Sequence, residues 1–234
     1  IKMNCKKGEN MEKYISKKEK ASYGFAAVGS YMVAGITQSY LMYFFTDILI
    51  IPSAFVMMLM IVARVWDALN DPMMGVIVDR TSTKYGKMRP YVLIGSFLML
   101  VTTIVLFMPL TGAPTMFKMI FAAVSYIIFG MAYTLTDVPA MGLMSVATPS
   151  SDERASLLSF YVTVGSVGSL LPVGLLTIFR PFIPEKYVYF AMSIFVGIIT
   201  SAAYLTLFKN SKERFSTHTE KIAVRDMIKA ACKN

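Results

Sequence analysis

The chain has 234 residues, of which 56% are hydrophobic and only 16% are charged, and its formal net charge is +9. This balance differs from that of a soluble globular domain and is typical of a protein with several membrane spans. Because the positive charge is confined to particular segments between apolar runs, it does not indicate a nucleic-acid-binding protein.

Six long apolar segments follow one another along the chain. Each is close to or above the roughly 20 residues that an α-helix needs to cross a bilayer. They are predicted at residues 22–48, 54–78, 91–109, 116–146, 157–180 and 187–208. The first follows a lysine-rich stretch and has no signal-peptide cleavage site, so we interpret it as a membrane helix.

The expected fold class is all-α, a polytopic membrane protein with six transmembrane helices. We expect a polar amino-terminal tail at residues 1–21, a six-helix bundle at 22–208 and a second polar segment at 209–234. The chain begins with an isoleucine and ends within a basic stretch. Six helices with both ends on one side form half of a twelve-helix carrier made of two parallel repeats. The sequence therefore predicts the amino-terminal half of such a carrier, with the carboxy-terminal half as its missing partner.

Lys and Arg are distributed unevenly between alternate connections. Of the 23, 19 lie in the two tails and in the loops at 79–90 and 147–156. The connections near 49–53, 110–115 and 180–186 hold two. The positive-inside rule therefore predicts an inner-membrane protein whose two ends and 79–90 loop face the cytoplasm.

The second predicted helix carries strongly polar residues in its middle. Arg64, Asp67 and Asp71 are spaced i, i+3 and i+7 and share one helix face, with Asn70 at its edge. A charged side chain at the bilayer centre costs about 3 kcal/mol even on mild insertion scales, so this face should point into a bundle or a watery cavity. Both a site for a transported species and a structural ion cluster fit the pattern.

The loop after this helix contains Gly75, Asp79, Arg80, Gly86 and Lys87 in the order Gly-x-x-x-Asp-Arg…Gly-Lys. It resembles the cytoplasmic loop signature of the major facilitator superfamily. The resemblance implies that these residues form a conformational latch on the cytoplasmic side of a carrier.

Four further pieces, at residues 40–47, 64–75, 87–91 and 133–139, resemble a narrower family. Together they are similar to the glycoside–pentoside–hexuronide:cation symporters, and Asp-Ala-x-Asn-Asp-Pro-x-Met-Gly in the second helix is the most specific piece. The resemblance covers the chain from about residue 22 to its end.

The resemblance implies a cation site at Asp67, Asn70, Asp71 and Thr134. Carboxylate, amide and hydroxyl oxygens suit a hard monovalent ion such as Na⁺ or Li⁺, and a pair of nearby carboxylates can bind H⁺ instead. Beyond this coupling ion, no cofactor is expected.

The resemblance also places Asp137 at the family's sugar-binding carboxylate, and we assign Tyr133, Tyr31 and Arg64 to the same solute site. An ionised carboxylate accepts hydrogen bonds from two hydroxyl groups, and tyrosine rings can stack on a sugar face.

Three positions depart from the family. Its acidic residue in the first helix is Tyr31 here, preceded by Ser30. An aromatic position in the fourth helix is Met141, and a basic position in the fifth is Val162. The cation site thus matches the family more closely than the sugar site does.

The predicted function is cation-coupled (Na⁺ or H⁺) symport of a sugar or glycoside, with that solute, the ion and membrane lipid as partners. Because the sugar site departs from the family, a carrier of a non-sugar amphipathic solute remains an alternative, as does a membrane sensor that does not transport. An enzyme is not expected, since the chain has a single histidine, His218, in a polar tail and no visible metal-ligand or nucleophile constellation.

Overall fold

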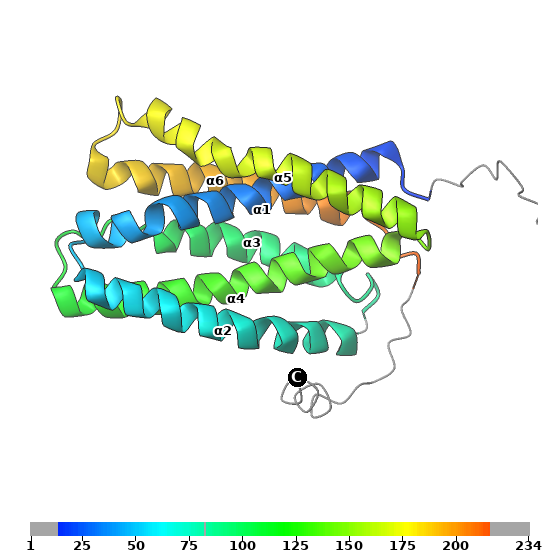
Figure 1. Cartoon of the computed structure of the whole chain (residues 1–234), viewed down its shortest axis with the longest axis horizontal. Coiled ribbons are helices and arrows are strands. Elements are labelled where there is room, and N and C mark those ends of the chain that lie inside the picture. Colours follow the sequence, from blue (N-terminus) through cyan, green and yellow to red (C-terminus); the bar gives the residue numbers. More distant parts are fainter. Residues whose placement is uncertain (1–13, 82, 216–234) are drawn as a thin grey trace, which may run out of the picture.

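The computed structural model describes residues 14–81 and 83–215 (Figure 1). These residues form six long α-helices: α1 (Lys17–Tyr43), α2 (Ser53–Arg80), α3 (Arg89–Leu106), α4 (Thr115–Ala147), α5 (Ser151–Phe179) and α6 (Glu185–Asn210). A short π-helix, η1 (Phe44–Ile48), continues α1. The all-α prediction is confirmed for this part of the chain, which contains no β-strand and a single isolated bridge between Thr83 and Gly86. Most of the predicted tails, residues 1–13 and 216–234, lies outside the described residues.

Five of the six helices, α2 to α6, are long and apolar enough to cross a membrane. Helix α1 does not meet that measure, because small and hydroxyl-bearing residues are interspersed along it. Many of them are buried among neighbouring helices. Length and composition thus support five of the six predicted spans, and α1 is the most polar of the long helices.

The helices run back and forth and form one bundle (Figure 1). Helix α1 packs on α5 and α6, α3 packs on α4 and α6, and α2 packs mainly on α4. Helix α2 therefore lies at one edge of the bundle, and its inner face meets α4.

Helices α1 and α5 begin five and six residues earlier than the apolar segments predict, at residues 17 and 151 and not at 22 and 157, and serine caps explain why. The Ser16 hydroxyl accepts a hydrogen bond from the Glu19 N–H at 3.1 Å, at the start of α1. The Ser150 hydroxyl does the same for the Glu153 N–H at 3.4 Å, at the start of α5. A capping side chain satisfies an N–H of the first turn, so the cap and not hydropathy sets the helix start.

Helices α2, α4 and α5 each continue through a proline, at Pro72, Pro139 and Pro172. Proline has no N–H, so the carbonyl four residues earlier lacks its usual helical partner. Pro72 follows Asp71 directly and Pro139 lies two residues after Asp137. Both prolines therefore interrupt the backbone hydrogen bonding beside a candidate site residue.

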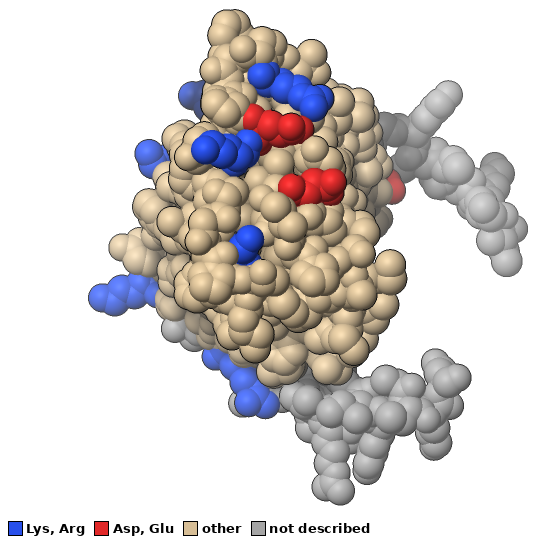
Figure 2. All heavy atoms as spheres, turned by 90° about the vertical axis from the view of Figure 1, so that its left-hand side faces the viewer, with Lys and Arg blue, Asp and Glu red and all other residues tan. Residues whose placement is uncertain are grey.

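The uneven distribution of charge maps onto opposite ends of the bundle. The connections with few basic residues meet at the end on the left of Figure 1, which faces the viewer in Figure 2. That face shows few charged side chains, most of them toward α5 and α6, where Arg180 forms an exposed ion pair with Glu185 at 3.2 Å. The 79–90 loop lies at the other end.

Candidate functional site

Two of the predicted cation-site residues meet where α2 packs on α4. The Thr134 hydroxyl on α4 donates a hydrogen bond to Asp71 Oδ1 on α2 at 2.8 Å. Thr134 is buried, and Asp71 is exposed at the edge of the bundle. The contact joins residues 63 positions apart in the chain and brings a carboxylate and a hydroxyl oxygen together.

The other two predicted cation residues lie on the same side of α2. Asp67 and Asn70 are half-buried, and neither makes a hydrogen bond with another described residue through its side chain. Asp67 approaches α4 closely, because a Cβ atom placed on Gly130 would lie 3.1 Å from Asp67 Oδ1. The glycine therefore gives the carboxylate room beside α4, where no described residue donates a hydrogen bond to its oxygens.

Arg64 shares this face of α2, as its spacing predicts, but it neutralises neither carboxylate directly. It is exposed, and within the described residues it forms no ion pair with Asp67 or Asp71. Within the described residues, Arg64 also forms no hydrogen bond or ion pair with Tyr31, Tyr133 or Asp137. The three charged residues thus share one face of α2 and lie near one another, but Arg64 makes no direct ion pair there with either carboxylate.

A second polar cluster surrounds Asp137 on α4, one turn beyond Thr134. Asp137 Oδ1 accepts hydrogen bonds from the Ser30 hydroxyl of α1 at 2.9 Å and from the Tyr204 hydroxyl of α6 at 3.4 Å. The Ser30 hydroxyl also lies 3.2 Å from the Tyr133 hydroxyl. Asp137 Oδ2 has no hydrogen-bond partner among the described residues.

Tyr31 lies beside this cluster, between α1 and α5. Its half-buried ring meets the Tyr161 ring edge-on, with centroids 6.3 Å apart and an angle of 72°. The Tyr31 ring also packs over Gly165, where a Cβ atom would lie 2.7 Å from the ring. Three of the four predicted solute-site residues, Tyr31, Tyr133 and Asp137, are thus gathered in one region, and Arg64 belongs instead to the α2 face.

Three residues of this cluster were not predicted: Ser30, Tyr161 and Tyr204. Ser30 had been noted only as the neighbour of Tyr31. Tyr161 and Tyr204 stand in apolar runs, where a tyrosine ordinarily signals an interface or core residue. Only the packing of α5 and α6 against α1 and α4 brings their side chains toward Asp137.

At the opposite end from the α1–α2 connection, Glu213 holds the loop before α3. Its carboxylate accepts hydrogen bonds from the backbone N–H groups of Lys87, Met88 and Arg89 at 2.8, 2.9 and 3.0 Å. These N–H groups open α3, where the helix dipole favours a negative charge. Gly86 has a φ of +107°, and a Cβ atom there would collide with the Glu213 carboxylate. The Gly-Lys pair of the predicted latch therefore has a definite partner.

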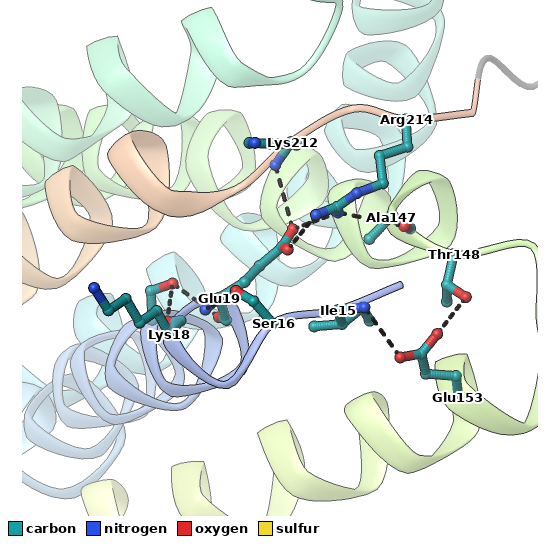
Figure 3. Close-up of polar contacts among 10 residues, drawn as sticks. Ile15, Ser16, Lys18, Glu19, Ala147, Thr148, Glu153, Lys212 and Arg214 are labelled. Carbon is teal, nitrogen blue, oxygen red and sulfur yellow. Dashed lines mark hydrogen bonds and ion pairs between the residues drawn. The ribbon is translucent and has the colours of Figure 1, made fainter. Parts of the chain in front are cut away.

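Glu213 belongs to residues 211–215, which we call the strap, and the strap also binds α1 (Figure 3). Arg214 donates two hydrogen bonds to the Glu19 carboxylate, at 2.9 and 2.8 Å, and the Lys212 N–H donates a third at 3.3 Å. The Glu19 side chain is only 2% exposed. The hydrogen bonds with Glu19 raise the pKa of Arg214 above its usual value, so the guanidinium remains charged.

The strap and its neighbours join four helix ends. The N–H groups of Arg214 and Phe215 donate to the Val146 carbonyl at the end of α4, at 3.2 and 3.1 Å. Nearby, the Glu153 carboxylate of α5 accepts from the Ile15 N–H at 3.1 Å and from the Thr148 hydroxyl at 2.6 Å (Figure 3). The ends of α1, α4, α5 and α6 are thereby tied together.

The remaining latch residues lie outside this network. A Cβ atom on Gly75 would meet nothing within 4 Å, so close helix packing does not require this glycine. Asp79 and Arg80 are exposed at the end of α2 and form no side-chain hydrogen bond or ion pair with another described residue. Of the five predicted latch residues, the structure brings together Gly86 and Lys87.

Comparison with known proteins places the chain in a family of membrane transporters. The family model described as "MFS/sugar transport protein" matches residues 22–234. The uncharacterized symporter YjmB of Bacillus subtilis is 32% identical over 95% of this chain and 50% of its own length. The putative glycoside/cation symporter YagG of Escherichia coli is 31% identical over 86% and 44%, and the isoprimeverose transporter of Lactiplantibacillus pentosus is 27% identical over 92% and 46%. The chain thus spans about half the length of the curated relatives it matches.

Proposed function

Because the chain belongs to the MFS/sugar transport protein family, whose members are membrane transporters and not enzymes, we propose that it forms the cation- and solute-binding half of a cation-coupled sugar or glycoside symporter. In this proposal a second six-helix half completes the carrier, since the relatives are about twice as long as this chain.

The observation that carries the proposal is the Thr134–Asp71 contact beside the free oxygens of Asp67. Asp71 accepts one hydrogen bond from a described residue and Asp67 accepts none, so most of their lone pairs have no protein donor. Together with Asn70 they offer the oxygen ligands that Na⁺ and Li⁺ prefer, and either carboxylate can instead take up H⁺.

The solute would bind one turn further along α4. Asp137 Oδ2 is available to accept a hydrogen bond from a sugar hydroxyl, while Oδ1 is held by Ser30 and Tyr204. Tyr133 and Tyr31 supply a further hydroxyl group and an aromatic face beside it. This arrangement supports a neutral polyol as the solute.

The two sites are adjacent on α4, and we infer that this adjacency couples them. An ion bound between Asp71 and Thr134 holds α2 against α4 and so orders the region around Asp137. Linkage then requires the ion and the solute to raise each other's affinity by the same factor, typically about 5- to 150-fold.

The test is calorimetric titration of the purified full-length carrier with isoprimeverose and a panel of 4-nitrophenyl glycosides, in NaCl and in choline chloride. Wild type should bind a member of this panel more tightly in Na⁺. Asp71→Asn should abolish the Na⁺ effect and keep weak binding, whereas Asp137→Asn should weaken solute binding and keep Na⁺ binding. Asp152→Asn is the matched control, because Asp152 is exposed in the first turn of α5 and forms no side-chain hydrogen bond or ion pair with a described residue. Unchanged Na⁺ dependence in Asp71→Asn would place the cation site elsewhere.

The departures at Met141 and Val162 favour a second candidate, an amphipathic solute, because both side chains are exposed and apolar, at 37% and 42%. A lysolipid titrated in the same way separates the two, since a lipid carrier would prefer it to every glycoside. Na⁺-driven flux in proteoliposomes distinguishes either carrier from a sensor, which would bind without transporting.

We further propose that the end bearing the strap and the 79–90 loop faces the cytoplasm of the inner membrane, since the basic residues concentrate there. A cysteine at Ser53 should react with an impermeant thiol reagent in intact cells, and one at Thr83 should not. The opposite pattern would reverse the orientation.

A further inference from the structure

Tyr161 of α5 is a fully buried tyrosine whose hydroxyl group lacks a hydrogen bond. The residue is 0% exposed, and its hydroxyl has no hydrogen-bond partner of normal geometry among the described residues. The hydroxyl nevertheless lies near the Asp137 carboxylate and the Ser30 hydroxyl, close enough for a weak polar interaction with both but without the geometry of a normal hydrogen bond. The Tyr161 hydroxyl therefore lies at the edge of the cluster around Asp137, the carboxylate that we propose binds the solute.

A structural role for the ring alone does not account for this hydroxyl. A buried polar group without a partner costs free energy, and a phenylalanine would fill the same space without that cost. The Asp137 cluster already has donors for one carboxylate oxygen, in Ser30 and Tyr204. Among the described residues, neither Asp137 Oδ2 nor the Tyr161 hydroxyl has a hydrogen-bond partner of normal geometry.

We propose that Tyr161 is a solute-binding residue, with its hydroxyl group placed to hydrogen-bond a sugar whose neighbouring hydroxyl binds Asp137 Oδ2. The proposal rests on the sugar-symport function proposed above and names its substrate class more closely. A carboxylate accepts from one hydroxyl and a phenol donates to the next, so the pair suits two adjacent hydroxyl groups on a neutral sugar ring.

In this proposal Tyr31 regulates access to Asp137 and Tyr161. Its half-buried ring packs edge-on against the ring of the fully buried Tyr161 and so forms part of the cover over that residue. The Tyr31 ring can occupy its position only because residue 165 is a glycine. A Cβ atom on Gly165 would lie 2.7 Å from the Tyr31 ring. A change of the Tyr31 rotamer uncovers Tyr161 and leaves the tyrosine ring free to stack on the entering sugar.

The experiment compares Tyr161→Phe with Tyr23→Phe in the full-length carrier. Tyr23 is the matched control, because it is also fully buried with an unpartnered hydroxyl, but it lies on α1 one turn from Glu19, toward the strap. The probe is whichever of isoprimeverose and the 4-nitrophenyl glycosides wild type binds most tightly. We expect Tyr161→Phe to bind it roughly 10-fold more weakly, the effect of one hydrogen bond, with unchanged Na⁺ binding. Tyr23→Phe should bind like wild type.

The outcomes separate this inference from the function on which it rests. If Tyr161→Phe binds the probe like wild type while Asp137→Asn does not, the inference is wrong and the sugar site stands. If Tyr23→Phe loses as much affinity as Tyr161→Phe, the loss reflects the bundle and not a contact, and the inference is again wrong. If wild type binds no glycoside of the panel, the proposed function fails and the inference fails with it. A thermal unfolding midpoint at or above that of wild type in Tyr161→Phe would show that the variant is folded.

Discussion

The carboxylates at two places in the bundle differ in how many hydrogen bonds they accept from the protein. One group lies at the strap end, and the other lies in the middle of α2 and α4. At the strap end, Glu19 receives three hydrogen bonds and Glu213 receives three. In the middle of the helices, Asp71 receives one, and Asp67 receives none from the described residues. Asp137 receives both of its hydrogen bonds on the same oxygen.

The difference separates structural carboxylates from those available to a ligand. A buried charge is tolerated when hydrogen bonds and an opposite charge compensate its lost hydration. Glu19 meets that condition through Arg214, and Glu213 is compensated by three backbone N–H groups at the start of α3, so we expect both to stabilise the bundle. The helix carboxylates do not, and an ion or a solute can supply what is missing.

The largest expected effect is on stability, from Glu19→Gln in the strap network. Removing the charge leaves Arg214, whose side chain is 25% exposed, without its partner. Loss of one member of a buried pair costs about 3 kcal/mol of unfolding free energy. Thermal unfolding of the detergent-solubilised full-length carrier should show a clearly lower midpoint.

The matched control for this prediction is the exposed pair at the opposite end. The side chains of Arg180 and Glu185 are 65% and 46% exposed. Glu185→Gln should therefore cost less than about 1 kcal/mol, as is usual for surface ion pairs. Equal midpoints for the two variants would show that the strap does not stabilise the bundle.

A somewhat smaller loss is expected from Gly86→Ala. An alanine at a φ of +107° is strained, and its Cβ atom would displace the Glu213 carboxylate from the N–H groups that open α3. Strain of this kind costs about 1–3 kcal/mol. The unfolding midpoint of the full-length carrier should fall.

Gly75→Ala is the control, because it adds the same methyl group within α2 where nothing lies within 4 Å. Alanine is the better helix former, so this variant should be as stable as wild type or more stable. If both glycine variants lost stability alike, the contact between Gly86 and Glu213 would not be the cause.

The positions of the helices were predictable from hydropathy. The contacts between segments that are distant in the sequence were less predictable. Apolar runs located the helices, and the family resemblance placed Asp71 and Thr134 at one site, where the structure joins them. The Glu213 contact was not predictable, because Lys87 and Glu213 are 126 residues apart and the strap reads as an ordinary basic segment. Helix periodicity describes one helix at a time and does not specify such pairings.

The same reasoning explains why the hydroxyl groups that surround Asp137 were missed. Ser30, Tyr161 and Tyr204 come from three helices other than α4, and each is unremarkable within its own segment. Their convergence depends on how α1 packs between α5 and α6. A resemblance transfers residues that match a motif, and these three match none.

The smallest expected effect concerns the hydroxyl group of Thr134. Thr134→Val keeps the shape of the side chain and removes the group that donates to Asp71 Oδ1 at 2.8 Å. If that hydroxyl is also an ion ligand, Na⁺ affinity of the full-length carrier should fall about 5- to 10-fold, because one polar contact contributes about 1 kcal/mol. Solute affinity in choline chloride should not change.

Thr136→Val on the same helix distinguishes an ion ligand from a general effect of removing a hydroxyl group. Thr136 is also buried, but its hydroxyl donates to the Ala132 carbonyl of its own helix at 2.7 Å and not to α2. This variant should bind Na⁺ like wild type in the same calorimetric titration. If Thr134→Val also kept its Na⁺ affinity, Thr134 would only position Asp71. The carboxylates and amide of α2 would then have to bind the ion without help from α4, and the coupling proposed here between cation and solute would lose its structural basis.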